Sequence, residues 1–275
     1  MLRLYDAARR RVEPVVPAGA RSLRLYAFGP SAGHRPHLGD LRSFLLADLI
    51  GRLAGRRRVR VLACHATDGE AFADDLPALN VRPPDRSLPV DEAATLVSGF
   101  APGVIELGTP PGLIVFDAGL PGIARWTGSG RLLFEGRELL AGQGGEGAVR
   151  LRDVTEAGLD PLAVRLALLG HHYREDAELT WDALRGADGT LRLWRFRVAT
   201  WSEAPSAPMP ADRVAAIEDA LDDDLGSPAA LRLMDELERD ESLAPGSRFE
   251  AFLHLDQVLA LDLPSEIGRS RPPAG

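Results

Sequence analysis

The sequence predicts an α/β protein in which a parallel sheet core is followed by a helical domain. An apolar strand, a long amphipathic helix and a second strand follow one another between residues 23 and 64. That order is the unit from which parallel sheets are built. After Val149 the apolar residues recur mainly at helical spacing. We therefore expect a sheet core over residues 1–150, a helical domain over 151–265 and a disordered tail over 266–275.

Composition limits the possible functions. The 275 residues are 45% hydrophobic, enough for a sizeable core, and the net charge of −8 disfavours a broad basic surface for nucleic acid. The run Arg56-Arg57-Arg58 is expected to be a solvated helix end. The single cysteine, Cys64, excludes an internal disulfide and is expected to be buried. No apolar run reaches the roughly 18 residues of a membrane span, so we expect a cytoplasmic protein.

The elements of the first half follow from their patterns. Residues 2–17 predict a strand or hairpin, and residues 23–28 the first core strand. Helical spacing of apolar residues predicts a helix that ends at Gly55, with these core residues: Leu41, Phe44, Leu45, Leu46, Leu49, Ile50 and Leu53. Residues 59–64 predict the second strand. Prolines interrupt residues 70–97, which we interpret as a shortened connecting insertion at about 70–100.

Further strands are expected at residues 112–116 and 131–137. The glycine-rich stretch 141–147 is a linker or, more weakly, a phosphate-binding loop, since it carries no lysine. In the second half, Asp160 and Pro161 begin a helix that runs to Leu169. Three more helices are expected at 212–225, 228–239 and 249–261.

The turn between the first strand and the first helix is the candidate site. Helix N-termini favour anions such as a triphosphate, and His34 and His37 add ring donors there. Gly39 has no Cβ, so a ligand can approach the backbone closely. The alternative is a surface turn with Asp40 as a helix cap. Ligands of such sheets bind at the carboxyl ends of strands, so residues 65–68 are expected beside these histidines.

The residues of this turn belong to a longer series of stretches, which follow one another along the chain in the order in which one known family carries its motifs. They are Tyr26–Ser31, His37–Arg42, Thr67-Asp68, Pro102–Leu107, Phe134–Gly136, Leu151–Asp153, Leu168–Arg174 and Ala220–Pro228. They resemble, in turn, the motifs Y-x-C-G-P-T, H-I-G-N-A-R, T-D, P-G-W-H-I-E-C, V-E-G, L-R-D, L-L-S-x-H-Y-R and A-L-D-D-D-L-N-T-P of the cysteinyl-tRNA synthetases, which are class I aminoacyl-tRNA synthetases. The similarity runs to about residue 263.

This resemblance implies a Rossmann-like (HUP-type) parallel sheet, ATP with Mg²⁺ as cofactor, and roles for individual residues. It assigns catalysis to His37 and Asp40. It assigns cofactor binding to Gly29, Pro30, His34, His37, Gly39 and Asp40. It assigns substrate binding to Phe28, Ser31, Thr67, Asp68 and Leu107.

The sequence departs from the family where its chemistry is concentrated. Phe28 and Leu107 stand at the positions of two zinc-binding cysteines, and residues 112–124 contain neither His nor Glu, so we expect no zinc. Residues 138–142, Glu-Leu-Leu-Ala-Gly, replace the K-M-S-K-S loop, whose lysines stabilise the leaving pyrophosphate. Arg137, Arg150 or Arg152 could substitute in part.

The matches stop where the family's anticodon-binding domain would begin. We therefore expect no such domain and no recognition of a whole tRNA. The cysteine ligases of the mycothiol pathway, which are relatives of the family, are cut short in the same way but keep the zinc ligands and the lysine loop.

Two hypotheses remain. One is a cytoplasmic ATP-dependent, adenylate-forming ligase that acts on a small carboxylic or amino acid and a small acceptor. The other is an inactive pseudo-synthetase that binds a nucleotide, a metabolite or a protein partner. His171 and His172 are expected to pack or cap, since adjacent helix residues point apart, and Trp181, Trp194 and Trp201 to be core residues or to stack a base.

Overall fold

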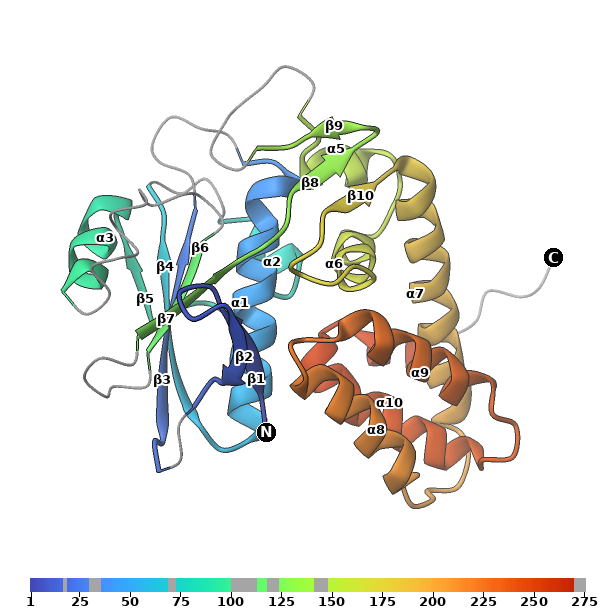
Figure 1. The fold of residues 1–275 in the computed structure, drawn as a ribbon. Helices are drawn as coiled ribbons and strands as arrows, with labels where there is room; N and C mark the ends of the chain where they lie inside the picture. The colour runs from blue at the N-terminus through green and yellow to red at the C-terminus, as the bar shows by residue number, and fades with distance from the viewer. Residues whose placement is uncertain are drawn as a thin grey trace.

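The main sheet is the centre of the first half of the chain (Figure 1). The computed structural model describes residues 1–16, 19–29, 36–68, 73–99, 113–117, 124–140 and 148–269. Within these residues the sheet has five strands in the order β5-β4-β3-β6-β7. Their bounds are β3 Ser22–Phe28, β4 Arg60–Ala66, β5 Arg86–Leu88, β6 Leu113–Asp117 and β7 Ala124–Gly128.

Strands β3, β4 and β5 run parallel, which confirms the predicted α/β class. The sheet as a whole is mixed, because β6 pairs antiparallel with β3 and β7 antiparallel with β6. The predicted parallel order therefore applies to β3, β4 and β5. Antiparallel neighbours need only a short connection, whereas parallel ones need a crossover. The short stretch between β6 and β7 fits the antiparallel arrangement.

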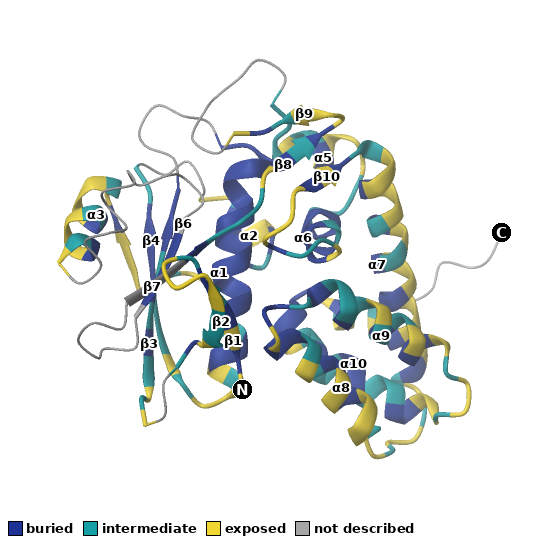
Figure 2. Cartoon of the chain, in the orientation of Figure 1, coloured by how far each residue is buried: buried dark blue, intermediate teal, exposed yellow. Residues whose placement is uncertain are grey.

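Helix α1, Leu38–Arg56, lies against one face of the sheet. Leu23, Leu25 and Ala27 of β3 alternate toward α1, as the period of two in a strand requires. The seven apolar residues predicted for the core of this helix are all buried. Dark blue in Figure 2 marks most of its length as buried. The helix ends one residue beyond the predicted Gly55.

The other face of the sheet packs against helix α3, Val90–Ser98. A smaller apolar cluster lies there, made of Phe28, Cys64, Ala66, Leu88, Ala93, Val97 and Val115. Cys64 is buried as predicted, and burial raises its pKa to about 11, so the thiol is a poor nucleophile. The predicted connecting insertion is more than a connection: it contains the short helix α2, Asp75–Ala78, then the edge strand β5, then α3.

Two small sheets complete the first half. Strands β1, Arg3–Asp6, and β2, Arg11–Pro14, form the predicted hairpin. Strand β8, Leu132–Phe134, turns into β9, Arg137–Glu138, and pairs in parallel with β10, Ala177–Leu179. At this turn Glu135 and Gly136 have positive φ angles of 48° and 74°, which glycine adopts without strain.

The second half of the chain is helical. Its helices are α5 Leu151–Glu156, α6 Leu162–Leu169, α7 Trp181–Trp201, α8 Ala211–Asp222, α9 Ser227–Arg239 and α10 Pro245–Leu259, followed by a short 3-10 helix, Leu263–Glu266. The four helices predicted here are confirmed, with shifted ends. Helix α7 was not predicted individually. The rings of Trp194 and Trp201 pack on Phe252 with centroids 5.7 and 5.2 Å apart, as core residues. Residues 270–275 of the predicted tail lie outside the described residues.

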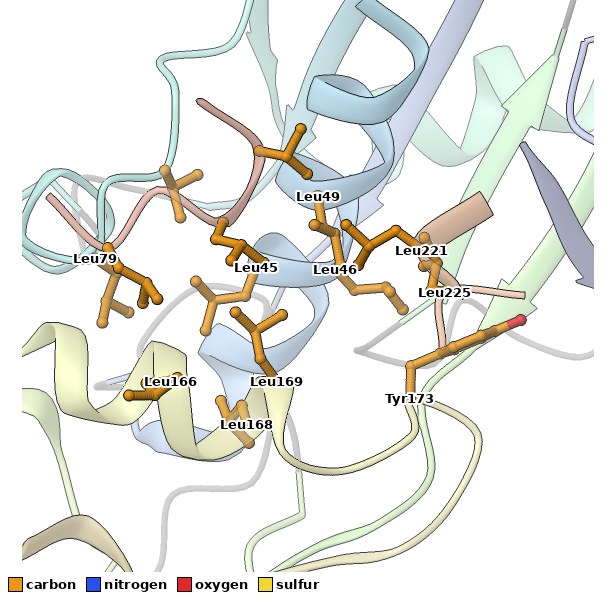
Figure 3. Close-up of a cluster of buried hydrophobic side chains, with 14 of the residues drawn as sticks. Leu45, Leu46, Leu49, Leu79, Leu166, Leu168, Leu169, Tyr173, Leu221 and Leu225 are labelled. Atoms are coloured by element: carbon orange, nitrogen blue, oxygen red, sulfur yellow. The ribbon is translucent and has the colours of Figure 1, made fainter. Parts of the chain in front are cut away.

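An apolar layer joins the helical half to α1 (Figure 3). Leu45, Leu46 and Leu49 of α1 face Leu168 and Leu169 of α6 in this view. Tyr173, Leu221 and Leu225 close one side of the layer. None of the described helices combines the length and apolar character needed to cross a bilayer.

Candidate functional site

His37 sets the start of helix α1. Its backbone is extended, with φ −128° and ψ 176°, and its Nδ1 accepts a hydrogen bond from the Gly39 N–H at 3.0 Å. In return, Asp40 Oδ2 accepts from the His37 N–H at 2.9 Å. This reciprocal pair is a capping box. Both side chains are buried, with 1% of each residue exposed. Asp40 therefore helps to cap the helix from its third position, behind the N-cap His37, and both lie buried where the alternative expected a surface turn.

The second ring nitrogen of His37 also has a protein partner. Because Nδ1 accepts, the proton of the neutral ring is assigned to Nε2. Nε2 lies 3.1 Å from the carbonyl oxygen of Leu140 and donates to it. The ring donor that the sequence offered to an anion is thus directed at the protein's own backbone.

The backbone donors at the start of α1 are satisfied in the same way. The N–H of Leu38 donates to the Val149 carbonyl at 3.0 Å, and the N–H of Asp40 to the His37 carbonyl at 3.0 Å. With the His37 and Gly39 donors already used, four successive N–H groups have partners. The Asp40 carboxylate adds negative charge. In this arrangement the described N–H donors at the start of α1 are used within the protein, and binding of a triphosphate there stays a prediction.

Gly39 permits a close approach, but by the protein itself. A Cβ at this position would lie 2.6 Å from the carbonyl oxygen of Leu139 and 2.8 Å from Cε1 of His37. Leu139 is 5% exposed. The segment 138–140, which stands where the resemblance places the first part of the lysine loop, therefore lies directly against the helix start.

Gly29 and Thr67 meet at the carboxyl ends of β3 and β4, whereas the expected convergence of residues 65–68 with His34 and His37 stays a prediction, because His34 lies outside the described residues. The Gly29 N–H donates to the Ala66 carbonyl at 2.8 Å, and a Cβ on Gly29 would lie 3.0 Å from Cγ2 of Thr67. Asp68 Oδ1 accepts from the N–H of Val90 at 3.0 Å and so fixes the start of α3. Phe28 points to the opposite face, where it is fully buried. Substrate binding by Phe28, Thr67 and Asp68 stays a prediction.

Four of the predicted site residues, Pro30, Ser31, His34 and Leu107, lie outside the described residues. The described ranges contain no group of three His, Cys, Asp or Glu side chains placed to hold a metal ion. Since residues 100–112 and 118–123 are not among them, the expected absence of zinc stays a prediction. That Arg137, Arg150 or Arg152 takes over part of the role of the loop lysines likewise stays a prediction.

Arg42 is a buried residue whose role the sequence did not indicate beyond its place in the H-L-G-D-L-R stretch. Its Nη1 donates to the carbonyls of Gly130 and Arg131 at 2.7 and 2.8 Å, and its Nη2 donates to that of Glu175 at 2.9 Å. Burial lowers its pKa to about 10. Arg42 therefore holds the chain that enters β8 and the chain that enters β10 against α1.

The remaining charged candidates have structural partners. His172 stacks on Tyr173 with centroids 5.0 Å apart, which confirms a packing role. Arg56 binds Glu218 of α8 at 2.5 Å, and Arg57 lies 2.6 Å from Asp222. Arg57 and Arg58 are exposed, as expected of a solvated helix end, whereas Arg56 is half-buried. Through their carboxylate partners, Arg56 and Arg57 anchor the end of α1 to the helical half.

Comparison with known proteins adds partial relatives. No family model matches the chain. It is 39% identical over 108 residues to an L-cysteine:1D-myo-inositol 2-amino-2-deoxy-alpha-D-glucopyranoside ligase of Acidothermus cellulolyticus. This alignment covers 39% of this chain and 25% of the relative. It is 42% identical over 90 residues to the ligase of the same name from Thermobispora bispora, covering 32% of this chain and 21% of the relative. It is 36% identical over 107 residues to the ligase of the same name from Beutenbergia cavernae, and this alignment covers 39% of this chain and 24% of the relative.

The chain thus matches a quarter or less of the length of these relatives. The predicted resemblance is confirmed at this level. Over about a hundred residues the chain is homologous to the mycothiol-type cysteine ligases, which are relatives of the cysteinyl-tRNA synthetases of class I.

Proposed function

We propose that this chain is a ligase-derived protein that binds a small molecule without forming an acyl-adenylate. The homology to ligases of small molecules supports the ligase-like scaffold. One observation carries the proposed loss of adenylation: the start of α1 is closed by its own groups, with His37 bonded to both Gly39 and Leu140.

The chemistry of adenylation explains why this closure matters. A carboxylate attacks the α-phosphate of ATP, and the pyrophosphate that leaves carries negative charge which donors and cations must stabilise. At the start of α1 the N–H donors are used internally and Asp40 adds a negative charge. The adjoining segment 138–140 is acidic and apolar. These groups oppose the charge that the reaction develops.

An active ligase is the second candidate, and the identity of 36–42% to the relatives favours it. In that case Gly29, Pro30, His34, His37, Gly39 and Asp40 would hold ATP with Mg²⁺. The activated acid would contact Phe28, Ser31, Thr67, Asp68 and Leu107, and a small amine or thiol would accept the acyl group. Residues Leu139 and Leu140 would first have to leave the helix start.

Several expectations accompany either candidate as proposals. We propose a cytoplasmic protein without zinc and without whole-tRNA recognition, divided near residue 150 into a sheet domain and a helical domain. Binding to a protein partner belongs to the first candidate and would be its remaining role if no small molecule bound.

Calorimetric titration with ATP and Mg²⁺ separates the two candidates. The proposal predicts that the wild type shows no His37-dependent ATP binding with a dissociation constant below about 1 mM. His37→Ala should therefore bind ATP as weakly as the wild type does. Binding in the micromolar range that is lost in His37→Ala, with the fold of the variant intact by circular dichroism, would favour the active ligase.

A further inference from the structure

A cavity of about 130 Å³ lies between the flank of α1 and the sheet. Small residues from both layers face it: Ala47 and Gly51 from α1, Ala27 from β3 and Ala63 from β4. Protein interiors seldom leave voids much larger than a water molecule, and this one is several times that size. The small side chains account for the size of the cavity. They do not account for the absence of larger side chains that would fill it.

His65 lines this cavity and lacks a hydrogen-bond partner. It is 7% exposed, and its ring packs edge-on against Phe44 with centroids 4.9 Å apart. Neither ring nitrogen bonds to another side chain or to the backbone in the described part of the chain, although a neutral imidazole offers one donor and one acceptor. These nitrogens are not among the fully enclosed polar atoms without a partner, so they reach the space of the cavity, where a polar ligand can bond to them.

Charges of both signs line the cavity, and one cation at its mouth has no carboxylate partner among the described residues. Asp48 lines the wall, but its Oδ2 is neutralised by Arg165 and Arg52, each at 2.7 Å. Asp85 lines the mouth, and its Oδ2 accepts the Ala63 N–H at 2.8 Å. Arg82 is exposed at the same mouth, and no carboxylate of the described residues pairs with it.

We propose that this cavity binds a small carboxylic acid whose short apolar body carries one hydrogen-bonding group such as a hydroxyl. The carboxylate pairs with Arg82 at the mouth, where water still reaches it, since burying a charge is costly. The body lies among the four small residues, and the hydroxyl bonds to His65. The inference goes beyond the proposed function by naming a ligand class, and it does not depend on the closed helix start.

Matched small probes test the ligand class. Calorimetry and ligand-observed NMR with 4-hydroxybutyrate are expected to show binding, with a shift of the His65 ring signals. Butyrate, which lacks the hydroxyl, and 1,4-butanediol, which lacks the charge, are each expected to bind about tenfold more weakly. No binding of any of the three at about 10 mM would overturn the proposal, as would equal binding of all three.

Matched variants test the place. Gly51→Leu fills the cavity, because a Cβ there has only ordinary contacts of 3.7 Å to Leu25 and Val61. Gly55→Leu, on the same helix with nothing within 4 Å, is its control. Arg82→Gln removes the cation, with the exposed Arg60→Gln as control. Both test variants are expected to bind 4-hydroxybutyrate at least about tenfold more weakly than their controls.

Unchanged binding in a folded Gly51→Leu variant would contradict the site. If that variant does not fold, the smaller Gly51→Ala and the surface change Arg82→Gln still decide the question. A failed adenylation assay leaves these outcomes untouched, because adenylation and this cavity involve different residues.

Discussion

Nη2 of Arg165 lies 2.7 Å from Oδ2 of Asp48, and both side chains are almost completely buried. The same guanidinium donates to the carbonyls of Leu259 at 2.6 Å and Leu79 at 3.0 Å. Burial lowers the pKa of Arg165, and the nearby Asp48 opposes that shift. One ion pair therefore ties α6 and the end of α10 to the middle of α1. It stabilises the packing of the helical half against the sheet half.

Replacing this arginine should therefore destabilise the whole chain. Arg165→Met leaves two buried carbonyls unpaired and Asp48 with Arg52 as its remaining cation. We expect a loss of about 3–5 kcal/mol in the free energy of unfolding, measured by urea denaturation. Arg185→Met is the control, because it removes an exposed pair with Asp182 and should cost less than about 1 kcal/mol. Similar losses in both variants would contradict the role given to Arg165.

The hydroxyl of Tyr173 is a second link between the halves. It donates to Asp224 Oδ1 at 2.6 Å and accepts from the Tyr5 N–H at 3.2 Å. Tyr173→Phe removes the hydroxyl's bond to Asp224, whereas the Tyr5 N–H keeps Asp224 Oδ1 at 2.8 Å, so we expect a loss of about 0.5–1.5 kcal/mol in unfolding free energy. Tyr5→Phe keeps the ring that faces the Arg174 guanidinium at 4.7 Å and should cost less than about 0.5 kcal/mol. A thermal or urea series on both variants checks this, and a neutral Tyr173→Phe would show that the hydroxyl adds nothing.

Two glycines of α1 should respond in opposite directions to alanine. Gly39→Ala places a Cβ 2.6 Å from the Leu139 carbonyl, so the segment 138–140 must move and stability should fall by about 1–3 kcal/mol. Gly55→Ala meets nothing within 4 Å and should stabilise the helix by about 0.5–1 kcal/mol. Urea denaturation of both variants measures whether each change lowers or raises the free energy of unfolding. Stabilisation by Gly39→Ala would mean that Leu139 does not lie against the helix start.

His65 should make stability depend on pH. Burial lowers its pKa from 6.5 to about 4 in the folded protein. Between these values the unfolded chain binds the proton more readily, so the free energy of unfolding falls as pH falls from 6.5 toward 4, by roughly 3 kcal/mol from this group. Above pH 6.5 the histidine is neutral in both states and contributes no slope. Urea denaturation of the wild type and His65→Asn at several pH values measures the difference, and parallel curves would contradict the burial of a neutral ring.

The sequence predicted the parts of the fold that have strong local patterns. The unit β3-α1-β4 was predicted because its apolar spacing is regular over a long stretch. Strand β5 was missed because it has only three residues between prolines, Arg86–Leu88. The direction of β6 could not be predicted, because strand orientation depends on the connection and not on the strand. Helix α7 contains Gly186 and Gly189, which lower its helix propensity and obscured its pattern.

In the candidate site, too, some contacts could be predicted from the sequence and others could not. The meeting of Gly29 and Thr67 could be predicted from the parallel order of β3 and β4. The contact between His37 and Leu140 could not, because 103 positions separate the two residues. The cavity beside His65 depends on which small residues face one another across two layers, which no local pattern reveals.

Exchange of labelled pyrophosphate into ATP is the most direct test of the central claim. The wild-type chain would be assayed with Mg²⁺ and a panel of amino acids and simple carboxylic acids, since exchange requires reversible formation of an adenylate. The closed start of α1 predicts no exchange above the rate without enzyme for any acid. Exchange with one acid, lost in His37→Ala, would contradict the account and establish an active adenylate-forming ligase.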